Sequence, residues 1–241
     1  MSKQVQDAYI VAATRTPVGK APRGMLRNVR PDDLLAHVLK AAVTQCPGLD
    51  KSVIDDVIVG CANQGGEDSR CVARHALLMA DLPIETPGTV IQRNCASGLG
   101  ALVHASHAIT AGEGDVFVVG GVESMSRAPF VMGKATEAFS RSAEIYDTTI
   151  GWRFINPLMK AQYGVDAMPE TGENVAEEFQ VSRADQDAFA IRSQQRAGAA
   201  IAAGYFAQEI APVSVPGGKA GPVIVDRDEH PRPETTLEGL A

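Results

Sequence analysis

The sequence is poor in the features that mark several common classes of protein. Aromatic residues make up only 5% of its 241 residues, which argues against a surface for stacking the bases of single-stranded nucleic acid. Acidic residues outnumber basic ones, 29 against 22, so the formal net charge of -7 disfavours a duplex nucleic acid partner. No apolar run approaches the roughly 20 residues that cross a bilayer, and the N-terminus lacks the features of a signal peptide. We therefore predict a soluble, cytoplasmic protein that binds neither nucleic acid nor membrane.

The cysteines do not have the spacing of a metal site. The four thiols stand at positions 46, 61, 71 and 95, and no two of them form a Cys-x-x-Cys pair. We therefore predict no zinc site and no other bound metal. Disulfides are not expected in a reducing cytosol, so each cysteine is judged by its own surroundings.

What the sequence does contain, in its first half, is an alternation of strand and helix patterns. Strands are predicted at residues 8–13, 53–61, 89–93 and 115–121, and helices at residues 31–43, 72–80 and 96–111. The strand at 115–121 is apolar enough for the centre of a sheet, and the helix at 96–111 has the small and apolar residues of a helix buried on most sides. This alternation predicts a layered α/β domain over residues 1–123.

The second half, residues 124–241, has a different pattern. Residues 124–168 show no sustained period, and two helices follow at 171–179 and 183–203, the second with Ser182 as its N-cap and Asp185 three residues on. Short edge strands are predicted at 210–213 and 223–225, before a charged, proline-broken loop at 226–233. We interpret this region as an α-rich insertion.

Cys95 is the strongest candidate for chemistry. It stands in Asn-Cys-Ala-Ser-Gly-Leu at residues 94–99, where a predicted strand ends and a predicted helix begins. A helix N-terminus carries roughly half a positive charge and free amide donors, which favour a thiolate and so a nucleophile. The alternative is that Cys95 is a buried small hydrophobic residue, as most free cysteines are. These residues alone leave the two interpretations equally open.

No histidine is placed to act as a base for this cysteine. His104 lies nine residues further along the predicted helix, about 13 Å away at 1.5 Å per residue, and His107 lies further still. His37 and His75 fall in other helices, and His230 falls in the closing loop. A nucleophilic cysteine would need a base from elsewhere.

Five segments together resemble thiolases over essentially the whole chain, in order. They are residues 12–20 (Ala-Ala-Thr-Arg-Thr-Pro-Val-Gly-Lys), 94–99, 120–126 (Gly-Gly-Val-Glu-Ser-Met-Ser), 173–178 (Glu-Asn-Val-Ala-Glu-Glu) and 182–190 (Ser-Arg-Ala-Asp-Gln-Asp-Ala-Phe-Ala). The resemblance implies an N-terminal half with a layered α/β/α fold, carrying the nucleophile on residues 1–123. It also implies a loop-domain insertion for CoA and acyl binding at 124–241.

The resemblance to thiolases implies CoA-dependent acyl transfer. Cys95 would attack the keto carbon of a 3-oxoacyl-CoA, and its backbone N–H would help to hold the thioester oxygen; in reverse, two acyl-CoA molecules condense. Met168 corresponds to the acyl pocket, although Ala167 stands where a histidine often precedes that methionine, and Arg232 corresponds to the arginine at the nucleotide end of CoA. Gly239 replaces a serine of some relatives and receives no role. Coenzyme A is a co-substrate, no cofactor is covalently bound, and homo-oligomers are usual in this family, which includes enzymes of fatty acid metabolism.

The sequence departs from thiolases in what is missing. The Asn-Glu-Ala-Phe segment, the Gly-His-Pro histidine and the Cys-x-Gly-Gly-Gly cysteine of the family occur nowhere in the 241 residues. We therefore expect a chain that lacks the base and one sheet strand and is at best partly competent alone. The rival hypothesis is a non-catalytic half-thiolase that only binds CoA or associates with other proteins; a condensing ketosynthase of the same superfamily is less well supported, because the insertion at 124–241 is of the degradative type.

Overall fold

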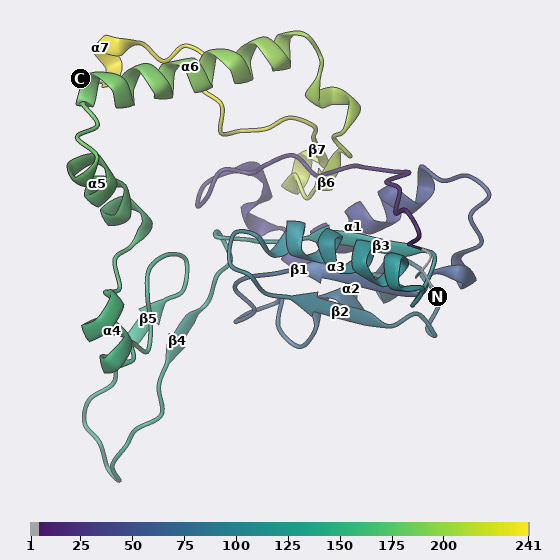
Figure 1. The fold of residues 1–241 in the computed structure, drawn as a ribbon, viewed down its shortest axis with the longest axis horizontal. Coiled ribbons are helices and arrows are strands. Elements are labelled where there is room, and N and C mark those ends of the chain that lie inside the picture. Colours follow the sequence, from purple (N-terminus) through teal and green to yellow (C-terminus); the bar gives the residue numbers. More distant parts are fainter. Residues whose placement is uncertain (1–4, 241) are drawn as a thin grey trace. The chain divides into compact units, whose positions relative to one another are not determined.

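The computed structural model describes residues 5–240, which form two compact units (Figure 1). The first unit comprises the described residues up to Arg127 together with Glu209–Arg227. The second unit comprises Ala128–Gln208 together with the described residues from Asp228 onward. The division expected from sequence placed all of 124–241 in one region, whereas the segment 209–227 lies in the first unit.

The helices and strands of the first unit follow the predicted alternation with two exceptions: the strand expected at 8–13 is absent, and the strand expected at 210–213 forms at Val213–Val215. They are α1 (Pro31–Thr44), β1 (Asp56–Gly60), α2 (Val72–Met79), β2 (Gly88–Ile91), α3 (Ser97–Ala111), β3 (Phe117–Gly121), β6 (Val213–Val215), β7 (Val223–Val225) and the 3-10 turns η1 (Met25–Asn28), η2 (Lys51–Val53) and η4 (Gly218–Ala220). Pro31 at the first position of α1 and the acidic side chains behind it agree with the helix start read from sequence.

The central sheet is parallel, with strand order β2-β1-β3. Val57 of β1 faces Gly88 of β2 on one side and Val118 of β3 on the other. The prediction that residues 115–121 lie at the centre of the sheet is wrong, because β1 occupies the centre and β3 lies at an edge. β3 is apolar because helices cover both of its faces, and its neighbours are set by the crossover connections, which its composition does not encode.

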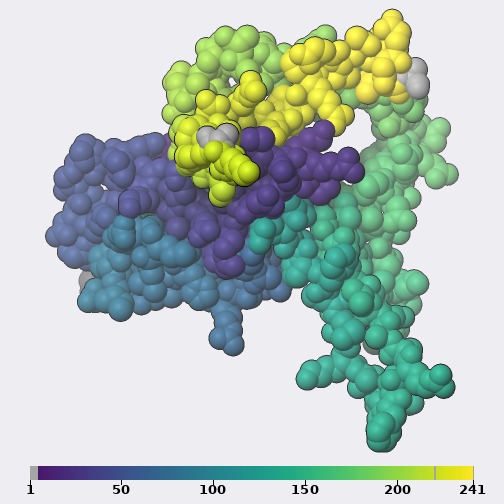
Figure 2. All heavy atoms as spheres, turned by 180° about the vertical axis from the view of Figure 1, so that it is seen from behind, coloured from purple at the N-terminus to yellow at the C-terminus, as the bar shows by residue number. Residues whose placement is uncertain are grey.

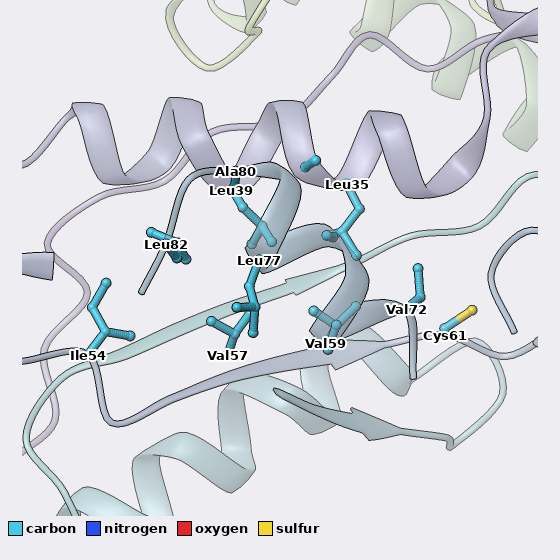
Figure 3. Packing of buried hydrophobic residues seen from close by; sticks show 13 residues of the cluster. Leu35, Leu39, Ile54, Val57, Val59, Cys61, Val72, Leu77, Ala80 and Leu82 are labelled. Atoms are coloured by element: carbon cyan, nitrogen blue, oxygen red, sulfur yellow. The ribbon is translucent and has the colours of Figure 1, made fainter. Parts of the chain in front are cut away.

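The pleat of β1 distributes its side chains over two layers of helix. Val57 and Val59 face α1 and α2, where they pack with Leu35, Leu39 and Leu77 (Figure 3). Ile58 points to the opposite face and packs against Ala101 and Ala105 of α3. The first unit is therefore a three-layer α/β/α arrangement, as alternating side chains along a strand require.

Helix α3 is buried along one face only. Its fully covered residues are Ser97, Ala101 and Ala105, spaced four apart, while Leu99 is 65% exposed. The expectation of burial on most sides is therefore wrong. Small residues at this spacing let the helix approach the sheet closely, and they do not by themselves imply cover on the outer face.

The predicted strand at residues 8–13 is absent. These residues are neither helix nor strand, and Tyr9, Ile10 and Val11 are 70–81% exposed. They line one side of a groove of about 450 Å³, whose other walls are formed by residues 115–119, α3 and the end of α1. An extended segment becomes a strand only when a neighbour completes its hydrogen-bond ladder, and the open edge of β3 does not pair with it.

The segment Glu209–Arg227 belongs to the first unit through backbone bonds and a small core. The N–H of Arg15 donates to the carbonyl of Glu209 (2.9 Å), and the N–H of Ala211 donates to the carbonyl of Arg15 (2.8 Å). Val213, Val215 and Val225 of the antiparallel pair β6–β7 pack with Leu26. Figure 2 shows the yellow-green atoms of this segment against the purple N-terminal residues.

The second unit is mainly helical. Its elements are β4 (Phe130–Met132), β5 (Ile145–Asp147), α4 (Pro157–Tyr163), α5 (Met168–Glu178), α6 (Arg183–Ala202), η3 (Phe206–Gln208) and α7 (Leu237–Leu240). Ser182 caps α6 as predicted, because its Oγ accepts the N–H of Asp185 (3.1 Å). Residues 124–168, expected to be irregular, contain the antiparallel pair β4–β5 and α4, which are too short to give a periodic pattern. None of the helices in residues 5–240 is long and apolar enough to span a membrane.

Candidate nucleophile site at Cys95

Cys95 lies in the short turn that joins β2 to α3. β2 ends at Ile91 and α3 begins at Ser97, so residues 92–96 reverse the direction of the chain. Asn94 has a φ of +50°, in the left-handed region that a non-glycine residue rarely adopts. The Cys95 side chain is exposed, unlike that of Cys61, which is buried. Exposure removes the alternative that Cys95 is a buried small hydrophobic residue.

The turn is held by the side chain of Ser97. Its Oγ accepts the N–H of Arg93 (2.8 Å) and donates to the carbonyl of Asn94 (2.6 Å). The backbone N–H of Ser97 also donates to the carbonyl of Asn94 (3.1 Å). Ser97 has no role predicted from sequence. The only signal for it was its place two residues after the cysteine, and its contacts depend on the left-handed turn.

Glycines at the ends of β1 and β3 let the first turn of α3 lie directly on the sheet. A Cβ atom on Gly60 would stand 2.2 Å from the carbonyl carbon of Ser97. One on Gly121 would stand 3.4 Å from the Cα of Gly98. The N–H of Val122 donates to the carbonyl of Gly60 (3.0 Å), which joins the two strand ends. The turn carrying Cys95 is thus seated at the carboxyl edge of the sheet, where ligands bind in open α/β folds.

Beside this edge, Cys61, Asp68 and Glu123 bring their ligand atoms within 4.8 Å of one another. The Glu123 carboxylate accepts the N–H groups of Ala62 (2.9 Å) and Asn63 (3.2 Å), and Asp68 accepts the N–H of Gly66 (3.0 Å). Burial, together with the negative charges of Glu123 and Asp68, raises the pKa of the Cys61 thiol to about 12. The two carboxylates fix the backbone of the loop after β1, and the neutral thiol is a packing group.

An ion-pair cluster fixes the same loop from its outer side. Glu67 binds Arg127 through both carboxylate oxygens (2.5 Å each) and also reaches Arg30 (3.2 Å). The hydrogen bonds from Arg127 are the largest of the effects that lower the pKa of Glu67, and the positive charges of Arg127 and Arg30 add to them. Residues distant in sequence therefore fix the loop that follows β1.

Met168 and Arg232, the other two residues singled out from sequence, lie in the second unit. Met168 is the first residue of α5, and its side chain is 70% exposed. Arg232 is exposed; its N–H donates to Oε1 of Gln194 (2.6 Å), and its carbonyl accepts the hydroxyl of Thr235 (2.7 Å). Cys95 belongs to the first unit, so the acyl and CoA roles of Met168 and Arg232 stay predictions.

Among the described residues of the first unit, no hydrogen bond joins a histidine to the turn that holds Cys95. His104 and His107 are exposed on α3, two and three turns beyond its start. His37 lies in α1, and its Nε2 is buried with no hydrogen-bond partner among residues 5–240. His230 belongs to the second unit.

Known proteins share this fold and sequence. The family description "Thiolase, N-terminal domain" matches residues 8–241. The chain is 61% identical to the beta-ketoadipyl-CoA thiolase of Pseudomonas knackmussii over 98% of its own length and 58% of that protein's. It is 57% identical to the 3-oxoadipyl-CoA/3-oxo-5,6-dehydrosuberyl-CoA thiolase of Escherichia coli K12 over 98% of its length and 59% of that protein's.

A solved structure agrees with these matches. The crystal structure of the Bacillus anthracis acetyl-CoA acetyltransferase superposes with a TM-score of 0.85 at 34% identity, covering 98% of this chain and 58% of that one. The chain therefore spans a little under three fifths of the length of these relatives. The match of the family description to nearly every residue, together with the elbow at Cys95, shows that the chain belongs to the thiolase family.

Proposed function

We propose that this chain carries the nucleophile half of a thiolase reaction, in which Cys95 accepts an acyl group from a CoA thioester. One observation carries the proposal: the only exposed cysteine among the described residues sits on a strand–turn–helix elbow in a member of the thiolase family. A thiol in such a turn is open to a large substrate and close to the amide groups of a helix N-terminus.

The proposed reaction breaks one carbon–carbon bond of the substrate and passes the acyl group from Cys95 to CoA as a thioester. In cleavage, Sγ of Cys95 bonds to the C3 keto carbon of a 3-oxoacyl-CoA, the C2–C3 bond breaks, and the departing acetyl-CoA takes up a proton. Free CoA then attacks the acyl-cysteine, its thiol proton returns to Cys95, and the acyl group leaves as acyl-CoA. The reverse sequence is a Claisen condensation of two acyl-CoA molecules. Each step needs a group that moves a proton, and Cys95 cannot supply that group itself.

The second unit is proposed to hold the substrate. Met168 is exposed at the start of α5 and would contact the acyl chain, while Arg232 would meet the phosphates of CoA. On this proposal residues 128–208 and 228–240 bind CoA and the acyl group, and residues up to 127 with 209–227 carry the nucleophile. Coenzyme A is then a co-substrate.

A six-carbon acyl chain with a terminal carboxylate is the proposed substrate. Two relatives, 61% and 57% identical, have names that specify a ketoadipyl- or oxoadipyl-CoA, and the identity covers 98% of this chain. Fatty acyl chains, as in fatty acid metabolism, are the alternative; the 38% identical relative from Bacillus subtilis is a 3-ketoacyl-CoA thiolase. The two classes differ in whether the end of the acyl chain is charged.

A matched pair of substrates separates these classes. 3-Oxoadipyl-CoA and 3-oxohexanoyl-CoA have the same chain length and differ in the terminal carboxylate. We expect CoA-dependent cleavage of the first to exceed that of the second by at least about tenfold, since one well-placed charged contact contributes that much. Cys95→Ala abolishes the cleavage, while Cys46→Ala, at a half-buried thiol, leaves it unchanged.

The second candidate is a CoA-binding module without catalysis. It is favoured by one observation: within the described residues of the first unit, no histidine hydrogen-bonds to the turn that holds Cys95. On this hypothesis CoA binds, as calorimetry would detect, but neither substrate is cleaved by the folded chain. Cleavage that depends on Cys95 contradicts it.

We also propose that the protein is a cytoplasmic homo-oligomer. β2 and β3 both lie at edges of the sheet, and each has one side without a neighbouring strand among the described residues. Open edges invite pairing with another chain. Sedimentation of the purified chain as a single monomeric species would contradict the oligomer, and recovery of the protein with the membrane fraction would contradict the location.

A further inference from the structure

Ser97 is buried directly beneath the turn that exposes Cys95. Only 4% of its surface is accessible, although it lies between exposed residues on both sides. Its hydroxyl is fully engaged, because Oγ accepts from the N–H of Arg93 (2.8 Å) and donates to the carbonyl of Asn94 (2.6 Å). One side chain thereby closes the turn from both ends.

The turn has few other supports for its unusual backbone. Asn94 holds a φ of +50°, a conformation that is unfavourable for a non-glycine residue. Ala96 precedes α3 and offers no side-chain cap. The N–H of Asn94 donates to Oε1 of Gln92 (2.9 Å), but both of these residues are exposed. Among the side chains of residues 92–97, Ser97 alone is buried.

The sheet fixes Ser97 in turn. Gly60 allows the end of β1 to touch the backbone of Ser97, and no larger residue fits there, since a Cβ would lie 2.2 Å from its carbonyl carbon. Ser97 thus connects the end of β1, which its backbone contacts, to the turn, which its hydroxyl bonds. The Ser97 hydroxyl is held by the sheet and bonds two backbone groups of the turn. Such a hydroxyl is suited to hold a nucleophile in place.

We propose that Ser97 is a positioning residue for Cys95. It touches no substrate; it fixes the backbone of residues 93–96 so that the thiol and its own N–H meet an incoming thioester together. A thiol can be accessible without a fixed backbone around it. Acyl transfer, however, needs the sulfur and the amide donor to reach the same carbonyl group at the same time. The acyl-transfer part of this inference rests on the proposed function, and the structural part does not.

The test compares variants that differ only in the hydroxyl group. Ser97→Thr keeps it and Ser97→Val replaces it with a methyl in nearly the same shape, so any strain from the added methyl is common to both. Ser97→Ala is the simple deletion, and Ser106→Ala, the same change on the same helix, is the matched control. Three rates are measured on the full chain: amide exchange of Arg93 by NMR, alkylation of Cys95 by iodoacetamide, and acylation of Cys95 by acetyl-CoA.

In Ser97→Val and Ser97→Ala we expect the Arg93 amide to exchange at least about tenfold faster and acylation to slow by a similar factor, the effect of one lost buried hydrogen bond. Alkylation of the exposed thiol should change by less than about threefold, because it needs access alone. Ser97→Thr should keep acylation and Arg93 exchange near the wild-type rates, as should Ser106→Ala.

Three results would overturn the inference. Acylation and alkylation could fall together, which would indicate a general loss of structure. The Val and Ala variants could both keep the wild-type rates of acylation and Arg93 exchange, which would show that the hydroxyl is irrelevant. Arg93 exchange could be unchanged, which would show that the turn holds without Ser97. If wild-type Cys95 is never acylated, the proposed function fails, and Arg93 exchange still decides whether Ser97 holds the turn.

Discussion

Gly60 shows how a single missing side chain shapes the site. The end of β1 meets the first turn of α3 at this residue, so Gly60→Ala would force a Cβ into the Ser97 backbone at 2.2 Å. We expect a loss of about 1–3 kcal/mol in the free energy of unfolding, or more, as for other overpacked sites. Urea unfolding followed by circular dichroism measures it.

Gly98→Ala is the matched control for that change. A Cβ on Gly98 meets nothing within 4 Å, and the residue lies in the first turn of α3. Alanine there should leave stability unchanged or raise it by up to about 1 kcal/mol, through helix propensity. The fluorescence of Trp152, the only tryptophan, reports on the second unit and should not change in either variant. Equal stability of the two variants would mean that the strand end does not touch α3.

Cys61 should make the free energy of unfolding fall as the pH rises through the alkaline range. Its pKa is raised from 9.0 to about 12, so the folded state holds the proton more tightly than the unfolded chain does. The contribution is complete below about pH 9 and is lost as the pH rises toward 12. Between pH 9 and 10 we expect the wild type to lose about 1 kcal/mol more than Cys61→Ala loses. Urea titrations at the two pH values measure this difference, and a parallel decline in both proteins would refute it.

Elements with a strong internal pattern could be predicted from the sequence. The helix at Pro31–Thr44 and the strands at Asp56–Gly60 and Gly88–Ile91 carry their own periodicity, capping or β-branched runs, and they form where expected. The segment 8–13 has an equally strong apolar pattern but is no strand, because a strand exists only with a partner. The wrong prediction that β3 lies at the centre of the sheet has the same cause. The apolar pattern of a strand does not specify which strands pair with it.

The candidate site divides in the same way. The strand–cysteine–helix junction was visible in residues 94–99, because it depends on local sequence. The bonds of Ser97, the loop support from Glu123 and the clearance at Gly60 were not visible. The support from Glu123 and the clearance at Gly60 join groups that only the folded sheet brings together, such as Glu123 with Ala62 and Asn63, 61 and 60 residues apart in the chain.

Because the N-terminal segment is exposed, the same Val→Ala change should cost much less unfolding free energy there than in the core. Val59→Ala removes two methyl groups from the fully buried core of β1 and should cost about 2–3 kcal/mol. Val11→Ala alters a side chain that is 81% exposed and should cost less than about 0.5 kcal/mol. Urea unfolding of both variants tests this. A cost for Val11→Ala close to that for Val59→Ala would place residues 8–13 in a paired strand.

At the scale of the molecule, the chain combines two units of different structure. The first is an α/β/α layer structure that fixes an exposed thiol at the edge of its sheet, and the segment 209–227 returns to complete it. The second carries α5, α6 and the loop with Arg232. The sequence indicated a change of character near residue 124, but the return of residues 209–227 depends on Val213, Val215 and Val225 finding Leu26, which no local pattern encodes.

The proposed function depends most on Cys95 as the acyl acceptor. The direct measurement is mass spectrometry of the folded chain after brief mixing with acetyl-CoA, with the modified residue located by peptide mapping. We predict one acetyl group, on Cys95, that is removed again by excess free CoA and is absent in Cys95→Ala. An unmodified Cys95 in a folded chain that alkylates normally, or acetylation spread equally over Cys46 and Cys95, would contradict the account.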